Sequence, residues 1–160
     1  MEENKPLKYL GYAIVCAEVP DEISLAFNIS GCEHQCEDCH SKYLWDYNGE
    51  YISEDLEETI VKYKGLISCV CFMGGDQNIN ELTALCSIAK EYGMKTCIYS
   101  GNDSVDVFRK LITNNLIDYL KIGRYDSSCG GLNKPTTNQR MYKITNNSFE
   151  DITSRFWRKP

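Results

Sequence analysis

The stretch that most limits what this chain can fold into is a loop with three cysteines. Cys32, Cys36 and Cys39 follow the spacing C-x3-C-x2-C, so their sulfur atoms can reach a single inorganic centre. Thiolate is a soft ligand that suits iron–sulfur clusters, zinc and Cu(I). A cubane cluster has four irons and usually takes four cysteines. Three cysteines would leave one iron free to bind a substrate.

A structural zinc site is the alternative reading of the same loop. It would combine the three cysteines with His34 or His40, because such a site needs four closed ligands. Zinc knuckles and ribbons usually join a C-x2-C pair to a second, distant ligand pair, and the sequence has no second pair of that kind. The spacing therefore favours a cluster, and a zinc module that binds a protein partner stays open as an alternative.

Nine cysteines are a high and odd count for one chain. Without a secretion signal, we expect reduced thiols in a reducing compartment. Five of them lie among apolar or small residues and are expected to pack as small hydrophobes: Cys16, Cys69, Cys71, Cys86 and Cys97.

Length and charge limit the number of domains and the classes of partner. The 160 residues suit one domain that spans residues 1–160. A net charge of −6 argues against nucleic acid or an anionic membrane as the main partner. No apolar run is long enough to span a bilayer. We therefore expect a cytoplasmic protein with no nucleic-acid or membrane partner.

Hydrophobic periodicity predicts alternating strands and helices. Residues 23–29 alternate apolar and polar side chains, which is typical of a strand, and lead through Gly31 into the cysteine loop. Residues 67–73 form a continuous apolar run, which suits a strand that is buried on both faces of a parallel sheet. Ser53 and Asn80 are expected to cap helices. The whole expected set comprises strands at 7–19, 23–29, 67–73, 95–99, 119–122 and 139–144, and helices at 53–65, 80–92 and 105–114. This order predicts a parallel α/β architecture.

The flanks of the cysteine loop carry a family resemblance. Residues 27–31 read Phe-Asn-Ile-Ser-Gly before Cys32, and Cys39-His40 is followed by Leu-Trp-Asp at 44–46. This arrangement resembles the radical SAM superfamily, and within it the activating enzymes of glycyl radical enzymes. It most resembles the activating protein of the anaerobic (class III) ribonucleotide reductase, over roughly residues 8 to 145. The resemblance implies an α/β fold: a partial, open parallel β/α barrel of the radical SAM type with about five to six strands.

The resemblance also implies an activity. Cys32, Cys36 and Cys39 would hold a 4Fe-4S cluster whose open iron binds the amino and carboxylate groups of S-adenosyl-L-methionine. Reductive cleavage would give a radical that takes hydrogen from a glycine of the anaerobic ribonucleotide reductase large subunit, with flavodoxin or ferredoxin as the electron donor. No side chain is expected to be catalytic. A radical SAM enzyme that acts on a small molecule or on another glycyl radical enzyme is the alternative within this class.

Further residues match the S-adenosylmethionine contacts of the family. Gly74, Gly75 and Asp76 follow a predicted strand and resemble the Gly-Gly-Glu turn, where glycines let carbonyl groups approach the ammonium and the carboxylate adds charge. Ser100, after the strand at 95–99, resembles the polar position that faces the ribose. Asp38 stands where many members have an aromatic residue near the adenine, so packing against the adenine is expected to come from His40 or from the backbone.

Two later segments also resemble the activating proteins. These are Gly-Arg-Tyr at 123–125 and Thr-Thr-Asn-Gln at 136–139, joined by a predicted long loop at 126–138. Ile122 stands where the family segment has an aspartate, so no carboxylate role is expected at that position. The aromatic residues at 43–46 can serve either as a plug over the core or as a functional surface.

Overall fold

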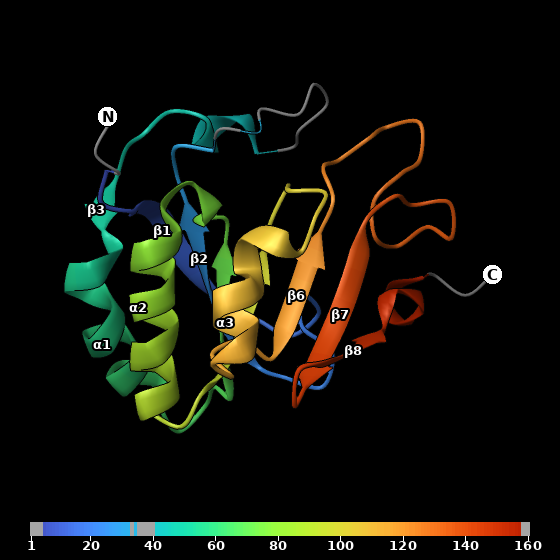
Figure 1. Cartoon of the computed structure of the whole chain (residues 1–160). Helices are drawn as coiled ribbons and strands as arrows, with labels where there is room; N and C mark the ends of the chain where they lie inside the picture. Colours follow the sequence, from blue (N-terminus) through green and yellow to red (C-terminus); the bar gives the residue numbers. More distant parts are fainter. Residues whose placement is uncertain (1–4, 33, 35–40, 158–160) are drawn as a thin grey trace.

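The chain forms one mixed β-sheet with helices packed against it (Figure 1). The computed structural model describes residues 5–32, 34 and 41–157. Eight strands lie in the order β3-β1-β2-β4-β5-β6-β7-β8. Their bounds are β1 (Lys8–Val15), β2 (Ser24–Ile29), β3 (Glu50–Tyr51), β4 (Cys69–Met73), β5 (Lys95–Tyr99), β6 (Tyr119–Ile122), β7 (Arg140–Thr145) and β8 (Ser148–Asp151).

Three α-helices and four 3-10 turns complete the described elements. The α-helices are α1 (Ile52–Tyr63), α2 (Ile79–Glu91) and α3 (Arg109–Thr113). The 3-10 turns are η1 (Lys42–Leu44), η2 (Asp76–Asn78), η3 (Asp106–Phe108) and η4 (Thr153–Phe156). Within the described residues, no helix has the length and the apolar composition needed to cross a bilayer.

The centre of the sheet is parallel and its flanks are antiparallel. Strands β2, β4, β5 and β6 pair in parallel, with Cys71 opposite Ala26 on one side and opposite Cys97 on the other. Strands β1 and β7 pair antiparallel with the outer members of this group. The carboxyl ends of the four central strands therefore meet at one edge of the sheet. The expected partial barrel of the radical SAM type stays a prediction.

Side chains alternate between two apolar layers because strand residues point to opposite faces. The helices α1, α2 and α3 lie on one face (Figure 1), where buried residues such as Phe27, Phe72 and Ile98 pack with Leu56 and Leu82. The opposite face has a smaller core of Ala26, Cys69, Cys71, Cys97 and Tyr119, against which Val19, Met141 and Ile152 pack.

Two expected helix caps are wrong. Helix α2 is capped by Asn78, whose side chain accepts a hydrogen bond from the backbone N–H of Glu81 at 3.1 Å, and Asn80 lies inside the helix. The 3-10 turn after Gly75 makes the chain turn early, so the cap of the helix lies two residues before the expected position. Ser53 lies inside α1, which begins at Ile52 directly after the short strand β3.

The strands at the two edges escaped sequence-based prediction. Strand β3 has two residues and β8 is exposed along its whole length, so neither shows an apolar pattern. Strand β8 follows β7 through Asn146 and Asn147, which have φ angles of 50° and 64°. Asparagine tolerates this left-handed conformation, which tight hairpin turns require.

Candidate functional site

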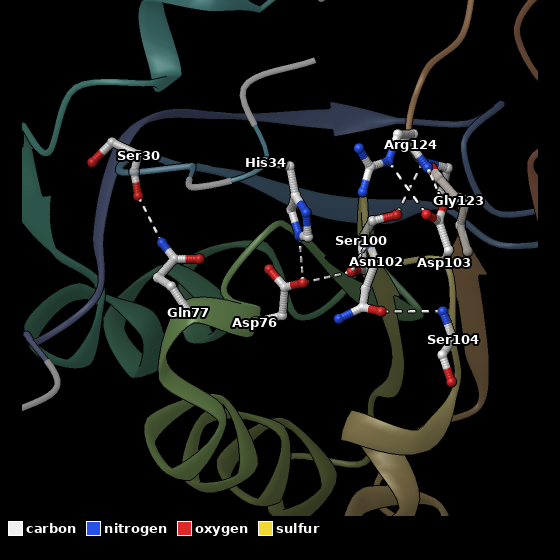
Figure 2. A network of polar contacts seen from close by, with 11 residues as sticks. Ser30, His34, Asp76, Gln77, Ser100, Asn102, Asp103, Ser104, Gly123 and Arg124 are labelled. Carbon is white, nitrogen blue, oxygen red and sulfur yellow. Dashed lines mark hydrogen bonds and ion pairs between the residues drawn. The ribbon is translucent and has the colours of Figure 1, made fainter.

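The carboxyl ends of the parallel strands are linked by backbone hydrogen bonds. The N–H of Gly74 donates to the carbonyl of Tyr99 at 2.8 Å, and the N–H of Ser100 donates to the carbonyl of Lys121 at 2.9 Å. The turns that follow β4, β5 and β6 therefore lie next to one another, and their side chains converge (Figure 2).

A cavity of about 220 Å³ opens at this edge of the sheet. Four residues that the sequence analysis singled out line it together: Cys32, Gly74, Asp76 and Ser100. Half of the other described lining residues are aromatic or apolar: Ile29, Leu44, Trp45, Met73, Tyr99 and Tyr125. A concave, mainly apolar site with a few convergent polar groups is typical of ligand binding.

Asp76 is the centre of the polar network in this cavity (Figure 2). Its Oδ2 lies 2.8 Å from Nε2 of His34 and accepts a hydrogen bond from the hydroxyl of Ser100 at 2.7 Å. The hydroxyl oxygen of Ser100 in turn accepts from the N–H of Asn102 at 2.9 Å. Three segments, the cysteine loop, the end of β4 and the end of β5, are thereby joined at one carboxylate.

The two glycines before Asp76 are required by the backbone. Gly74 and Gly75 have φ angles of 112° and 104°, which residues with a side chain rarely adopt. A Cβ on Gly75 would point into the core and meet Ile29 Cδ1 at 3.1 Å and Leu82 Cδ1 at 3.2 Å. Gly74 lines the cavity, whereas the missing side chain of Gly75 leaves room for core packing rather than for a ligand.

The cysteine loop is anchored where it leaves β2. The N–H of Cys32 donates to the carbonyl of Leu44 at 3.0 Å, and Gln77 Nε2 donates to the carbonyl of Ser30 at 2.9 Å. Cys36, Asp38, Cys39 and His40 lie outside the described residues. Within the described part of the chain, no group of three or more histidine, cysteine and acidic side chains is placed to hold a metal ion.

In the aromatic-rich segment at 43–46, different side chains match the two expected roles, a plug over the core and a functional surface. Leu44 is buried and Tyr43 is 57% exposed. Trp45 lines the cavity, and its Nε1 is buried without a hydrogen-bond acceptor among the described residues. A buried donor of this kind is costly unless a partner is supplied, so a bound group with acceptor atoms would fit here.

Lys121 is a charged residue of the site that the sequence analysis missed. It lies on β6, is only 8% exposed and lines the cavity. Its Nζ donates to the carbonyls of Ser100 at 3.1 Å and Gly123 at 2.8 Å. The sequence did contain a sign of this role, because a lysine in the middle of a short apolar strand is rarely buried without a reason.

The two later segments that resemble the activating proteins contact each other. Gln139 Nε2 donates to the carbonyl of Gly123 at 3.4 Å, and Asn138 Nδ2 donates to the carbonyl of Arg124 at 3.0 Å. Gln139 is buried and lines the cavity. The expected loop at 126–138 therefore begins and ends beside the site.

Most of the remaining cysteines pack in the core as expected. Cys69, Cys71, Cys86 and Cys97 are buried, and burial raises the pKa of the thiols of Cys69, Cys86 and Cys97 above the ordinary range. Cys16 is exposed, so its expected packing role is wrong. It follows the last residue of β1, where the chain leaves the sheet.

Comparison with known proteins assigns the family. The family model described as "4Fe-4S single cluster domain" matches residues 23–146, which include the cysteine loop, the Gly-Gly-Asp turn and Lys121. No curated protein and no solved structure matches the chain. The match covers well over half of the sequence and confirms the iron–sulfur centre expected from the cysteines. The chain therefore belongs to the family of 4Fe-4S single cluster domains.

Proposed function

We propose that this protein is a radical SAM activase that generates the glycyl radical of an anaerobic ribonucleotide reductase. One observation carries the proposal: Cys32, Gly74, Asp76 and Ser100 line a single cavity at the carboxyl ends of adjacent parallel strands. These residues come from three separate segments, and each matches a different part of the motif set by which the chain resembles this family.

Cys32, Cys36 and Cys39 would hold a 4Fe-4S cluster, which would supply the one-electron reduction that cleaves the S–C5′ bond of S-adenosylmethionine into methionine and the 5′-deoxyadenosyl radical that takes hydrogen from glycine. The electron comes from flavodoxin or ferredoxin. The protein has to hold the reactants in line and keep water away, because the cofactors carry the chemistry. No side chain of this chain needs to exchange a proton with the substrate.

The cavity offers a fitting group for each part of S-adenosylmethionine. Asp76 can accept hydrogen bonds from the ammonium, and its two hydrogen bonds among the described residues both end on Oδ2. Ser100 is buried beside it, where its hydroxyl can meet a ribose hydroxyl. Trp45 Nε1 is a donor that a bound group would satisfy. The apolar walls, which include Met73 and Tyr99, would exclude water from the radical.

The surroundings of the cavity favour a macromolecular substrate. Tyr43 is 57% exposed and Tyr47 is 36% exposed, and both follow the cysteine loop. The connection between β6 and β7 rises at the same edge of the sheet (Figure 1). A glycine loop of a partner protein could be held between these two segments and still reach the cavity.

Glycyl radical formation tests the proposal directly. The protein is reconstituted with iron and sulfide without oxygen, reduced, and mixed with S-adenosylmethionine and the purified large subunit of the reductase. We expect a doublet in the EPR spectrum that disappears when the radical glycine of the reductase is changed to alanine.

One control variant and two contrary outcomes separate the alternatives. Cys32→Ala should abolish both the doublet and S-adenosylmethionine cleavage. Ready cleavage with a small metabolite and no radical on the reductase would favour the small-molecule enzyme. A colourless protein that retains zinc and fails to bind S-adenosylmethionine would contradict the proposal altogether.

A further inference from the structure

The indole Nε1 of Trp45 is a buried donor at the wall of the cavity. The N–H group of tryptophan can only donate, and a buried tryptophan usually has a hydrogen-bond partner. Among the cavity-lining residues that the structure describes, Trp45 alone has a buried side-chain polar atom without a partner. In a native fold, an unpaired donor of this kind points to an acceptor that the polypeptide does not supply.

The indole ring is held in place by the segment that follows the cysteine loop. The backbone N–H of Trp45 donates to the carbonyl of Lys42 at 3.0 Å, and Nζ of Lys42 lies 5.6 Å from the centroid of the indole ring. The N–H of Cys32 donates to the carbonyl of Leu44 at 3.0 Å, and this carbonyl belongs to the peptide bond between Leu44 and Trp45. Trp45 is therefore fixed beside the first cysteine of the loop.

Two bound groups could supply the acceptor, the iron–sulfur cluster and a ligand of the cavity. The side chains that the proposed function assigns to S-adenosylmethionine, Asp76 and Ser100, follow β4 and β5, whereas Trp45 follows the cysteine loop. A ligand that leaves after each turnover would leave the donor unpaired between turnovers, but a resident cluster would pair with it throughout. Cys32 lines the same cavity as Trp45, so the cluster is the better candidate.

We infer that Trp45 donates an N–H···S hydrogen bond to a sulfur atom of the cluster and thereby raises the reduction potential of the cluster. Hydrogen bonds to the sulfurs are one of the factors that set this potential. The added electron makes the sulfurs more negative, so the donor stabilises the reduced form more than the oxidised form. The inference rests on the iron–sulfur centre that the family match assigns, and it holds whether or not S-adenosylmethionine is the substrate.

The reduction potential provides the first test. It is measured by redox titration, monitored by EPR, of the reconstituted protein without S-adenosylmethionine. Trp45→Phe keeps an aromatic ring and removes the N–H donor. We expect the equilibrium constant for one-electron reduction to fall about 3- to 10-fold, with the iron content unchanged. For a one-electron couple this is a shift of about 30 to 60 mV toward more negative potential.

The sign of the shift separates a lost hydrogen bond from a loosened wall. Water that entered a gap beside the phenylalanine would favour the more highly charged reduced form and would shift the potential in the opposite direction. Trp157, the other tryptophan of the chain, is 37% exposed and follows η4. Trp157→Phe is the matched control and should keep the wild-type potential.

A second measurement uses the native side chain, so it does not depend on how well Trp45→Phe folds. The indole nitrogens are labelled with ¹⁵N, and the reduced cluster is examined by pulsed EPR without S-adenosylmethionine. A hydrogen bond from Nε1 to a cluster sulfur should give a ¹⁵N hyperfine coupling in the wild-type protein. The coupling should persist in Trp157→Phe, because that variant retains Trp45.

The outcomes separate the inference from the proposed function. Absence of the ¹⁵N coupling in the wild-type protein would overturn the inference, and so would an unchanged or more positive potential in Trp45→Phe. A coupling that appears only after S-adenosylmethionine is added would assign the donor to that ligand and would also overturn it. A coupling and a negative shift in a protein that fails to cleave S-adenosylmethionine would support the inference and contradict the activase proposal.

Discussion

Nε2 of His34 lies 2.8 Å from Oδ2 of Asp76, so a residue between two of the loop cysteines is bonded to the end of β4. The imidazole ring also packs on Gly101, where a Cβ would come within 3.0 Å of it. The cysteine loop is therefore held against the turns that follow both β4 and β5. Through this contact, the part of the loop that follows Cys32 is joined to the polar groups of the cavity.

Removal of the imidazole should loosen the loop. His34→Ala deletes a partly buried hydrogen bond to a carboxylate, which corresponds to about 1–2 kcal/mol. We expect cluster loss to a chelator to become several-fold faster, with little change in the melting temperature. His34→Gln retains an N–H donor and should lie closer to wild type. Equal rates in all three proteins would contradict a role of His34 in holding the loop.

Each loop cysteine should be needed for the cluster. Cys32→Ala, Cys36→Ala and Cys39→Ala should lose most of the iron and all S-adenosylmethionine cleavage, because a cubane cluster cannot be held by two thiolates. Cys86→Ala is the matched control, since Cys86 is buried in the helix layer and distant in sequence from the loop. Iron and sulfide analysis of the reconstituted proteins measures the effect. Full iron content in Cys36→Ala would refute the assignment.

The two glycines of the turn should respond differently to substitution. Gly75→Val combines an unfavourable positive φ with a clash against Ile29 and Leu82, and should destabilise the protein by about 2–4 kcal/mol. Gly74→Ala meets Ile29 only at 3.6 Å and should cost about 1–2 kcal/mol, from backbone strain alone. Denaturant unfolding compares the two. Equal stabilities would mean that the core adapts to the side chain at position 75.

The cysteines should differ sharply in their reaction with an alkylating reagent. Cys16 is exposed and should react quickly in the native protein. Burial raises the pKa of the thiols of Cys69, Cys86 and Cys97, so their reactive thiolate forms are scarce at pH 8 and become populated only as the pH rises. Mass spectrometry after brief labelling measures this, with Cys16→Ser as the control. Rapid labelling of Cys97 in the folded protein would contradict the described core.

The sequence predicted the strands that have a clear apolar pattern and missed those that lack one. The expected strands at 95–99 and 119–122 agree with β5 and β6 to the residue. Strands β3 and β8 are short and exposed, so their pairing depends on neighbours that are distant in sequence. Helix starts depend on local turn geometry, which is why Asn78 rather than Asn80 caps α2.

The sequence predicted the site residues that belong to a motif. It did not predict the contacts that form only in the folded chain. Cys32, Asp76 and Ser100 were singled out from their positions after strands, and they line the same cavity. The contact between His34 and Asp76 spans 42 positions of the sequence, and no local pattern indicates it. Lys121 was overlooked because the strand was read for its apolar residues alone.

The two apolar layers described above are built from the strands and the helices. The buried side chains of Phe27, Phe72 and Leu82 pack between the sheet and the helices, and Cys32, the loop cysteine that the structure describes, belongs to neither apolar layer. Small zinc domains differ, because they have too little core to fold before the metal binds. We therefore expect this polypeptide to fold before it receives iron, so that cluster insertion is the last step of its maturation and a cluster damaged by oxygen can be replaced on an intact fold.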